Sequence, residues 1–382
     1  MKRPPTRDII LLFIATRLLL VMVTYFGYIL LVAPKDSALP VNMIALLTSW
    51  DHWDATNYVR IAQFGYQNVY DLAFFPLFPA VIWTIGHVLG SWSYLFVGTV
   101  ISNLALLGAL FVIYQLAVES MGEQVAHRTL LYLCIFPTAF FFFSAYNESL
   151  FLLLTASAFL AMRRQRWWLA GILGMLAALT RSAGLFLVIP YLWELWVSQG
   201  SIIGIRQKTL LRLLPIVLIP LGTALYCLYC WNVWGDPIAF VTVQSNWARQ
   251  LSWPWLGILV SLYELFWVQP FGSFNEAHIV LDLSATIGFI VLAVLGWRKL
   301  RLRFSYNLWL GILIFYSLIS PALTRHDAVQ SNQRFILEMF PAFFVLAALS
   351  VKHPRLHEAL MLTFPVLLAT LSVLFVMNRW MV

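Results

Sequence analysis

Apolar runs of about twenty residues recur along the whole sequence, and they constrain the fold more than any other feature. Hydrophobic residues make up 62% of the 382 residues, and the mean hydropathy of +0.83 lies far outside the range of soluble domains. A helix of roughly twenty apolar residues can cross a hydrocarbon core of about 30 Å, whereas barrels show short alternating segments. The sequence therefore predicts an all-α polytopic membrane protein. Its first run, Ile9–Val32, is expected to be a retained helix and not a cleaved signal peptide.

The net charge of +8 comes from basic residues that lie in short clusters between apolar runs. This pattern favours a bilayer and not a nucleic acid as the partner, because cytoplasmic loops of membrane proteins carry an excess of Lys and Arg. All the clusters are therefore expected on one side of the membrane. They are Lys2–Arg7, Arg163–Arg166, Arg206–Arg212, Arg298–Arg303 and Lys352–Arg355.

This placement predicts one integral membrane domain, 1–382, with about eleven spans, its amino end inside and its carboxyl end outside. Residues 34–90 then form a large first external loop. Within it, Ala73–Gly90 is expected to lie along the membrane surface or to re-enter, because Pro76 and Pro79 weaken its start. The expected spans are Ile9–Val32, Tyr94–Ala117, Thr129–Ala145, Ser149–Met162, Trp167–Thr180, Leu185–Trp196, Leu210–Trp231, Ala277–Trp297, Tyr306–Ile319, Phe335–Ser350 and Ala359–Val376.

Polar residues from six separate places are expected to gather on the outer side. Most of them, taken singly, are explained by contact with water or headgroups, and Trp50 and Trp53 by the ordinary interfacial aromatic belt. Arg181 is different, because apolar helix flanks it on both sides and its charge would be costly in lipid. The set is Asp51, His52, Asp54, Asn147, Glu148, Arg181, Asp236, Gln244, Arg249, Arg325, His326, Asp327, Gln333 and Arg334.

Such a set has the parts for transferring a group from a lipid phosphate to an acceptor. A carboxylate can take the proton of an attacking hydroxyl, and arginines can hold the departing phosphate. The motifs of soluble nucleotide-binding and hydrolytic enzymes are missing, so the donor should be lipid-borne. No cofactor is expected; a divalent metal is compatible with such carboxylates, but nothing in the sequence indicates one. Cys227 and Cys230 have no second ligand pair nearby and, like Cys134, are assigned to packing.

Five motifs in order resemble the PIG-V family, the second mannosyltransferase of GPI-anchor synthesis, and its prokaryotic relatives. The first is "WDATNYVRIAQFGY" from Trp53, followed by "AFFPLFP" in the same loop. The others are "FPTAFFFFSAYNESLF" from Phe136, "GILGMLAALTRSAGL" from Gly171, "WGDPIAFVTVQSNWAR" from Trp234 and "QRFILEMFP" from Gln333. The resemblance therefore covers most of the chain.

The resemblance implies a GT-C fold glycosyltransferase that uses a polyprenyl-phosphate sugar, typically mannose, and inverts the anomeric centre. It makes Asp54 the expected catalytic base, with Asp51 in an alternative register. Because they lie three residues apart, the two carboxylates can share one helical face. The remaining candidates are Arg181, Arg334, His326 and Arg325 around the donor phosphate, and Trp53, Tyr58, Glu148, Gln244 and Arg249 for substrate binding.

The chain lacks the long lumenal insertions of the eukaryotic enzyme, so the GPI acceptor is not carried over. We expect a prokaryotic plasma-membrane enzyme whose active site faces outward and whose acceptor is a lipid, a glycan or a protein. Two alternatives from other classes are a lipid or solute transporter, including a flippase, and a non-catalytic relative that binds a lipid-linked sugar. Transporter sites usually lie near the midplane between related halves, and no internal repeat is evident here.

Overall fold

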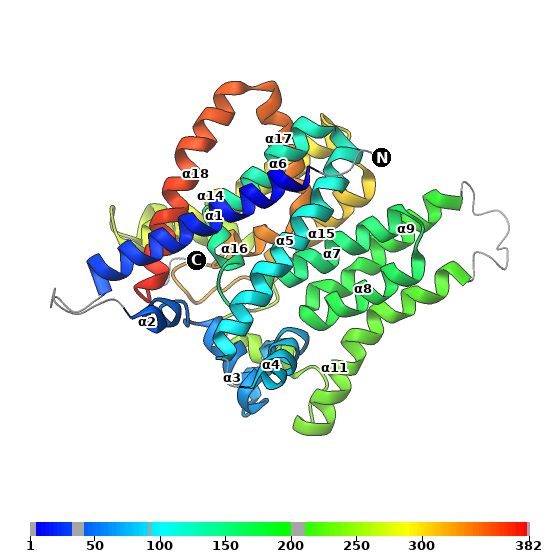
Figure 1. Cartoon of the computed structure of the whole chain (residues 1–382), viewed down its shortest axis with the longest axis horizontal. Coiled ribbons are helices and arrows are strands. Elements are labelled where there is room, and N and C mark those ends of the chain that lie inside the picture. The colour runs from blue at the N-terminus through cyan, green and yellow to red at the C-terminus, as the bar shows by residue number, and fades with distance from the viewer. Residues whose placement is uncertain (1–4, 33–41, 91–92, 200–210, 380–382) are drawn as a thin grey trace. The chain divides into compact units, whose positions relative to one another are not determined.

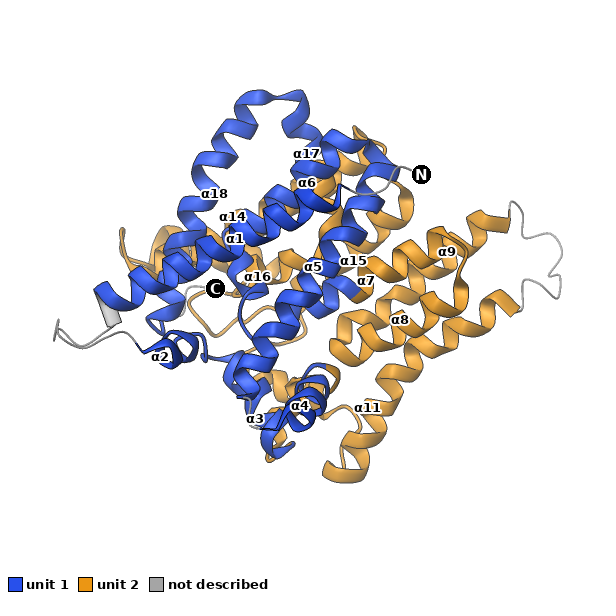
Figure 2. Cartoon of the chain, viewed as in Figure 1, with its two compact units in different colours: residues 1–65, 78–153, 346–381 blue, residues 66–77, 154–345, 382 orange. Residues whose placement is uncertain are grey.

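The computed structural model describes residues 5–32, 42–90, 93–199 and 211–379 (Figure 1). These residues form helices and connecting turns, without a β-strand among them. The chain divides into two compact units (Figure 2). Unit 1 comprises residues 1–65, 78–153 and 346–381, and unit 2 comprises residues 66–77, 154–345 and 382. The prediction of a single membrane domain stays a prediction.

Five helical segments are long and apolar enough to cross a membrane, and each coincides with an expected span. Their lengths and composition bear out the all-α membrane fold class. The other expected spans form helices of 12 to 16 residues or bent segments, so the count of eleven stays a prediction. The five segments are Thr6–Leu30, Tyr94–Met121, Leu211–Trp234, Phe274–Arg298 and Pro354–Val376.

The helices of unit 1 and those continuing across its boundaries have the following bounds. They are α1 Thr6–Gly27, α2 Met43–Thr48, α3 Asp54–Phe64, α4 Leu77–Leu89, α5 Tyr94–Met121, α6 Glu123–Ile135, α7 Glu148–Arg163, α17 Phe340–Lys352 and α18 Pro354–Val376.

Unit 2 holds the remaining α-helices of the described residues. They are α8 Trp167–Thr180, α9 Val188–Gln199, α11 Leu218–Trp234, α12 Ala239–Thr242, α13 Leu256–Tyr263, α14 Phe274–Arg298, α15 Phe304–Leu318 and α16 Asn332–Phe335.

Two expected helices are interrupted, and a proline accounts for each break. The expected helix Thr129–Ala145 ends with α6 at Ile135, because Pro137 forces Phe136 into an extended conformation with ψ of 143°. The expected helix Phe335–Ser350 is bent by 87° between α16 and α17. There Pro341 lies in the first turn of α17 and has no N–H to continue a helix from the preceding segment.

The apolar segment Ala73–Gly90 yields α4, which starts only after Pro76 and runs for 13 residues. At 1.5 Å per residue this helix is about 20 Å long, less than the roughly 30 Å of a hydrocarbon core. Its length therefore agrees with the expectation that this segment does not cross the membrane. The short α13 agrees with the same expectation for Leu256–Val268.

Close helix packing in unit 2 depends on small residues where α8 meets α11. A Cβ atom on Gly174 would lie 2.6 Å from Ile219, and one on Gly222 would lie 2.5 Å from the Met175 carbonyl oxygen. Glycine therefore lets the two backbones approach, as is usual for helices packed within a bilayer. This packing fixes the end of α8, where Arg181 follows.

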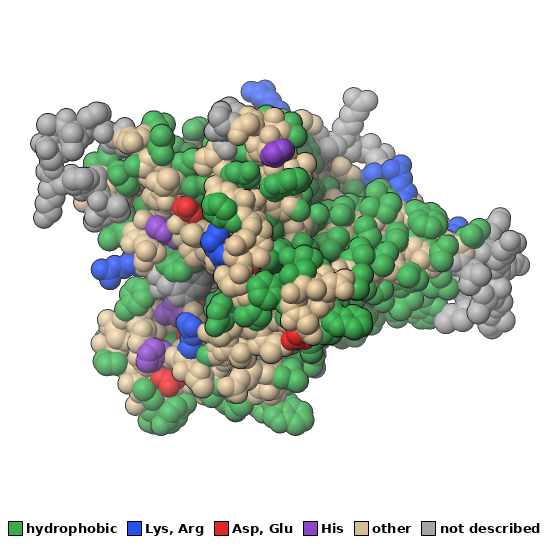
Figure 3. Space-filling model, turned by 90° about the horizontal axis from the view of Figure 1, so that it is seen from below, with side chains coloured by type: hydrophobic (Ala, Val, Ile, Leu, Met, Phe, Trp, Pro, Cys, Tyr) green, Lys and Arg blue, Asp and Glu red, His purple; other side chains and the backbone are tan. Residues whose placement is uncertain are grey.

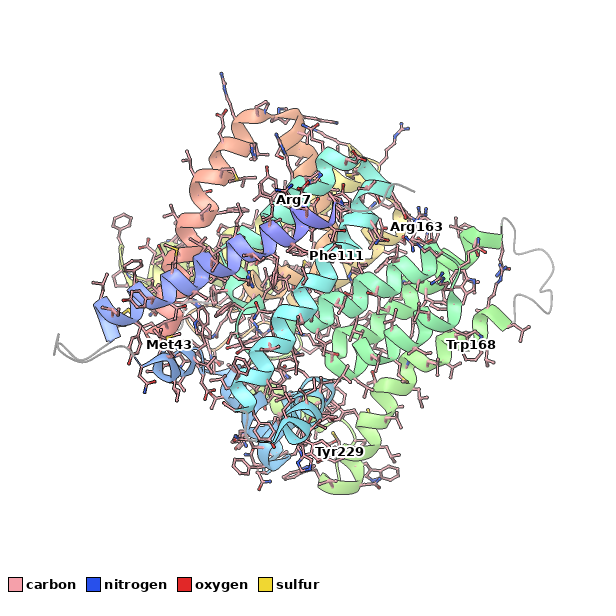
Figure 4. All side chains as sticks on the ribbon, viewed as in Figure 1. Arg7, Met43, Phe111, Arg163, Trp168 and Tyr229 are labelled. Atoms are coloured by element: carbon pink, nitrogen blue, oxygen red, sulfur yellow. The ribbon has the colours of Figure 1, made fainter. Side chains whose placement is uncertain are left out.

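Large apolar side chains are exposed along many helices, as expected of surfaces that face lipid. In Figure 3 a broad hydrophobic surface covers the end of unit 2 that carries α8, α9 and α11. Figure 4 shows Trp168 on α8 and Met43 on α2 as side chains projecting from their helices; their exposed fractions are 54% and 76%. A soluble monomer rarely carries so much exposed apolar surface.

Candidate functional site

The acidic segment, which we define as Trp50–Asp54, lies in unit 1 between the end of α2 and the start of α3. Its anchor is Trp50, whose side chain is 1% exposed. The Trp50 indole N–H donates to Thr24 Oγ1 at 3.0 Å, and its ring packs against Phe143 and Phe375 with centroids 5.0 and 5.3 Å away. The first residue of the segment is therefore fixed to α1 and α18.

Two side chains from the turn before α7 hold the backbone of the acidic segment. Ser144 Oγ donates to the Trp50 carbonyl at 3.1 Å, and the Tyr146 hydroxyl donates to the His52 carbonyl at 3.2 Å. These bonds tie the acidic segment to the "FSAYNES" motif, a contact over more than ninety residues of sequence. The two motifs that resemble one family thus meet within unit 1.

The two carboxylates do not share a helical face, contrary to the prediction. Asp54 is the first residue of α3, where a negative charge interacts favourably with the helix dipole, while Asp51 precedes the helix. Trp53 separates them with a φ of 51°, a value that L-residues rarely adopt. Such local strain persists only when surrounding contacts enforce it, and it often marks functional sites.

The carboxylate of Asp51 is half-buried, and its Oδ1 atom is enclosed without a hydrogen-bond partner. A buried carboxylate oxygen without a donor is costly, so it is suited to accept a hydrogen bond from a ligand. Asp54 is half-buried as well. Both carboxylates therefore retain some exposure, which a group that exchanges a proton with a substrate needs.

The other candidates in unit 1 are Trp53, which is half-buried, and Tyr58 and Glu148, which are buried. The Trp53 ring packs edge-on against Phe375 at 5.0 Å. Tyr58 is 4% exposed on α3 and packs against Phe78, so it belongs to the core of the unit. Glu148 is the first residue of α7 and is fully buried. Of these, only Trp53 lies within the acidic segment.

Three arginines of unit 2 surround one aromatic ring, an arrangement that we call the arginine cluster. The guanidinium carbons of Arg181, Arg249 and Arg334 lie 5.1, 5.3 and 5.9 Å from the centroid of the Phe335 ring. They come from the end of α8, from the segment after α12 and from α16. The structure therefore brings together Arg181 and Arg334, both expected at the donor phosphate, with Arg249, which was expected to bind substrate.

Each guanidinium in the arginine cluster is oriented by neighbours or by burial. Arg181 forms an ion pair with Glu338, which is 3% exposed. Arg249 donates to the carbonyls of Ser320 and Gln330, each at 3.0 Å. Arg334 is 5% exposed on α16. Three cations around one aromatic ring make this a concentrated positive region suited to a phosphate.

Burial lowers the pKa of the Arg249 guanidinium from its ordinary value, and the positive charges of Arg334 and Arg181 lower it further. Asp282 opposes this shift. An anion held beside the three guanidiniums would relieve their mutual repulsion. The electrostatics of the cluster therefore favour binding of a negatively charged group.

The remaining three candidates, Arg325, His326 and Gln244, are not among the residues that the structure places around the Phe335 ring. Arg325 and His326 are exposed in the turn before α16, with His326 Nδ1 at 3.5 Å from Gln269 Nε2. The Gln244 side-chain amide donates to the Phe240 carbonyl, and the Gln244 backbone carbonyl accepts the Arg249 backbone N–H, so this residue shapes the turn that carries Arg249.

Sequence reasoning missed Phe335 and Glu338 in the arginine cluster, because neither residue type signals its role without the contact. It also missed His278 and Asp282 on α14, which lie with Asp327 in a buried group that could hold a metal ion. A signal was present for these two residues. An ionisable side chain within an apolar membrane span is a functional candidate by default.

Comparison with known proteins adds a family and a fold. A family model described as "Mannosyltransferase (PIG-V)" matches residues 7–227. GPI alpha-1,6-mannosyltransferase 2 of Rattus norvegicus is 35% identical over 150 residues, covering 37% of this chain and 30% of that protein. The Homo sapiens protein of the same name is 32% identical over 149 residues, with coverages of 37% and 30%. The match thus spans under a third of the length of these relatives.

Among solved structures, ArnT from Cupriavidus metallidurans bound to undecaprenyl phosphate aligns with 92% of this chain and 62% of its own. The TM-score is 0.53 at 14% sequence identity. At this identity the similarity concerns the fold alone, and it bears out the GT-C fold expected from the sequence.

Proposed function

Because the chain belongs to the PIG-V mannosyltransferase family, we propose that it is a membrane glycosyltransferase that moves mannose from a polyprenyl-phosphate donor to an acceptor. Transfer takes place on the extracytoplasmic side of a prokaryotic plasma membrane and inverts the anomeric centre. The acceptor is a lipid, a glycan or a protein, and no nucleic acid takes part. The ArnT structure was solved with undecaprenyl phosphate bound, which supports a lipid-borne donor.

The arginine cluster is the observation that carries this proposal. Arg181 and Arg334 lie in the family's motifs, and both adjoin the Phe335 ring together with Arg249. A donor phosphate gains negative charge as the sugar leaves, so cations fixed in advance stabilise the transition state more than the ground state. Binding the phosphate is the task of these three residues.

Asp54 is the general base of the proposed reaction. Its carboxylate takes the proton of the acceptor hydroxyl as the oxygen attacks C1 of the mannosyl group. The bond from C1 to the phosphate oxygen breaks, and polyprenyl phosphate departs with the bonding electrons. Asp51, with its unpartnered Oδ1, binds the acceptor hydroxyl or orients it toward Asp54. No step of this reaction requires a metal.

The contacts of the acidic segment support this role for Asp54. Bonds with Thr24, Ser144 and Tyr146 fix Trp50 and His52, and the φ of Trp53 sets the direction from which α3 begins. A general base must be held within hydrogen-bond reach of the proton that it removes. A segment held at so many points meets this demand better than a flexible loop.

The test is transfer of labelled mannose from polyprenyl-phosphate-mannose by membranes that carry the wild type or a variant. Asp54→Asn should lower the rate by about 10²- to 10⁴-fold, the usual contribution of a general base. Asp8→Asn, a matched change at an exposed position in the first turn of α1, should leave the rate unchanged. The labelled fraction, lipid, glycan or protein, identifies the acceptor class.

Donor binding measured in parallel separates an enzyme from its alternatives. Loss of transfer with retained donor binding in Asp54→Asn supports an enzyme. Full transfer by Asp54→Asn together with loss in Asp51→Asn moves the base to Asp51. Movement of the labelled lipid across the membrane, without transfer by the wild type, would support a transporter and overturn the proposal.

A further inference from the structure

A compact group of metal-ligating side chains lies in unit 2 between α14 and the turn before α16. It consists of His278, Asp282 and Asp327, and we call it the His–Asp–Asp group. One ligand atom from each residue lies within 4.8 Å of the other two. Their exposed fractions are 8%, 0% and 3%. No function considered so far uses His278 or Asp282.

The helix and the turn place these residues for different reasons. His278 and Asp282 are four residues apart on α14, so their side chains lie on the same face of the helix. Asp327 reaches them from a turn that is close only in the folded chain. His278 Nε2 lies 3.8 Å from Asp282 Oδ2, and His278 Nδ1 lies 3.1 Å from Asp327 Oδ2.

Two atoms of the group are buried without a hydrogen-bond partner. They are His278 Nε2, which lies 3.8 Å from Asp282 Oδ2, and Asp327 Oδ2, which lies 3.1 Å from His278 Nδ1. Buried polar atoms are almost always hydrogen-bonded, so atoms that converge without a donor need an explanation. Convergence of a ring nitrogen and carboxylate oxygens is what a divalent cation requires of its ligands.

The other carboxylate contacts orient the group from outside. Asp327 Oδ1 accepts the Ser261 hydroxyl at 3.1 Å and the Val329 N–H at 3.0 Å. Asp282 Oδ1 accepts the Gln333 N–H at 2.8 Å, and its Oδ2 accepts the Ser331 N–H at 3.2 Å. Such supporting bonds fix the direction of metal ligands and often decide metal affinity.

The charge balance of the group depends on its imidazole, because His278 lies within salt-bridge distance of both carboxylates and is positively charged only when protonated. Two carboxylates are buried together, and no described Lys or Arg forms an ion pair with either of them. Arg249 interacts with Asp282 at longer range, but its terminal nitrogens donate to two backbone carbonyls. Burial of two negative charges is costly unless a positive charge is placed between them.

We propose that His278, Asp282 and Asp327 bind one divalent metal ion. One imidazole nitrogen and two carboxylates suit Mn²⁺ or Zn²⁺ better than Ca²⁺, which prefers a shell of oxygen ligands. Water or a ligand oxygen completes the coordination. Because Asp282 also accepts the Ser331 and Gln333 N–H groups, the metal would fix the backbone from which Arg334 and Phe335 project. The proposal does not depend on the transfer reaction.

The test measures metal content directly. The full-length, tag-free protein is purified in detergent, equilibrated with Mn²⁺ or Zn²⁺, and analysed by mass spectrometry for bound metal and by titration for affinity. We expect one ion per chain in the wild type and at least a tenfold loss of affinity in Asp327→Asn. His326→Gln, which changes the exposed imidazole next to Asp327, should retain the wild-type value.

A second variant guards against misfolding of Asp327→Asn. Ser261→Ala keeps all three ligands and removes only the bond to Asp327 Oδ1, so affinity should fall roughly 10- to 100-fold while the chain stays folded. Added metal should raise the melting temperature of the wild type and shift that of Asp327→Asn less. A wild type without stoichiometric metal, or a folded Asp327→Asn that binds as tightly as the wild type, would overturn the proposal.

Discussion

The molecule contains two pairs of carboxylates that share one residue type and differ in almost everything else. Asp51 and Asp54 lie three residues apart in unit 1 and are half-buried at the start of α3. Asp282 and Asp327 lie 45 residues apart in unit 2 and are almost completely buried. The first pair retains exposure at one helix end, whereas the second is enclosed by backbone N–H donors and an imidazole.

This difference separates two uses of a carboxylate. A group that exchanges a proton with a substrate must be reachable, so it is held by its backbone while its side chain is left incompletely satisfied. A group that fixes a cation is held by its side-chain oxygens and has no need of solvent. On this view Asp54 contributes to turnover and Asp282 to the fold of the region around Arg334.

The largest difference between the two carboxylate pairs is expected in the free energy of unfolding of their variants. Asp282→Leu leaves the Ser331 and Gln333 N–H groups buried without acceptors, at about 1–3 kcal/mol each. We therefore expect the free energy of unfolding to fall by about 3–5 kcal/mol. Asp54→Asn should change it by less than about 1 kcal/mol, because that side chain is half-buried.

Denaturant unfolding in detergent, followed by tryptophan fluorescence, measures both variants of this comparison. Similar losses of unfolding free energy in Asp282→Leu and Asp54→Asn would contradict this comparison. They would show that the acidic segment stabilises the fold as the His–Asp–Asp group does.

The next largest effect is expected on the transfer rate, and it compares an arginine of the arginine cluster with an exposed arginine of unit 2. Arg334→Lys keeps the charge but loses the planar fork that binds phosphate through two parallel bonds. We expect kcat/KM for the polyprenyl-phosphate donor to fall by about 10²-fold, within the range for removing a transition-state contact. Arg298→Lys, an exposed position at the end of α14, is the matched control. Equal losses in both variants would mean that the Arg334 guanidinium has no specific role at the donor phosphate.

A smaller effect is expected at Phe335, the ring that the three guanidiniums share. Phe335→Leu keeps an apolar side chain but removes the cation–π contacts, each worth about 0.5–2 kcal/mol. The KM for the donor should rise about tenfold while kcat changes less, because the arginines remain but are held less firmly. Kinetics at varied donor concentration distinguish these parameters. A fall in kcat with an unchanged KM would place Phe335 at the reacting sugar instead.

The sequence indicated the helices well wherever one apolar run ended in a recognisable signal. The expected span Trp167–Thr180 has the bounds of α8, because Gln165 and Arg166 precede it and Arg181 ends it. The prediction was wrong for Thr129–Ala145, where Pro137 ends the helix although the apolar run continues beyond it. Length alone therefore predicts a helix, while proline decides where that helix ends.

The candidate residues were predictable to a lesser degree, because a site is a set of contacts. Arg181 and Arg334 stood out through their motifs, yet their meeting at Phe335 depends on segments that are 153 residues apart. His326 was expected to supply a hydrogen bond near the donor phosphate, but the turn leaves its side chain exposed. Asp282 lies within the expected span Ala277–Trp297 and was not among the candidates, because its partner Asp327 meets it only in the folded chain.

The smallest effect concerns how the acidic segment is held. Tyr146→Phe removes the hydroxyl that donates to the His52 carbonyl and should lower the free energy of unfolding by about 0.5–1.5 kcal/mol. The transfer rate should fall by roughly three- to tenfold, because Asp54 lies two residues further along and a small displacement of a base slows proton removal. Tyr263→Phe, at an exposed position on α13, is the control.

A loss of rate that follows the loss of stability would mark Tyr146 as a residue that positions Asp54. A much larger loss of rate at unchanged stability would instead mean that the Tyr146 hydroxyl touches the substrate. The comparison between the carboxylate pairs would then change. The acidic segment would be one part of a larger reactive surface that includes the turn before α7.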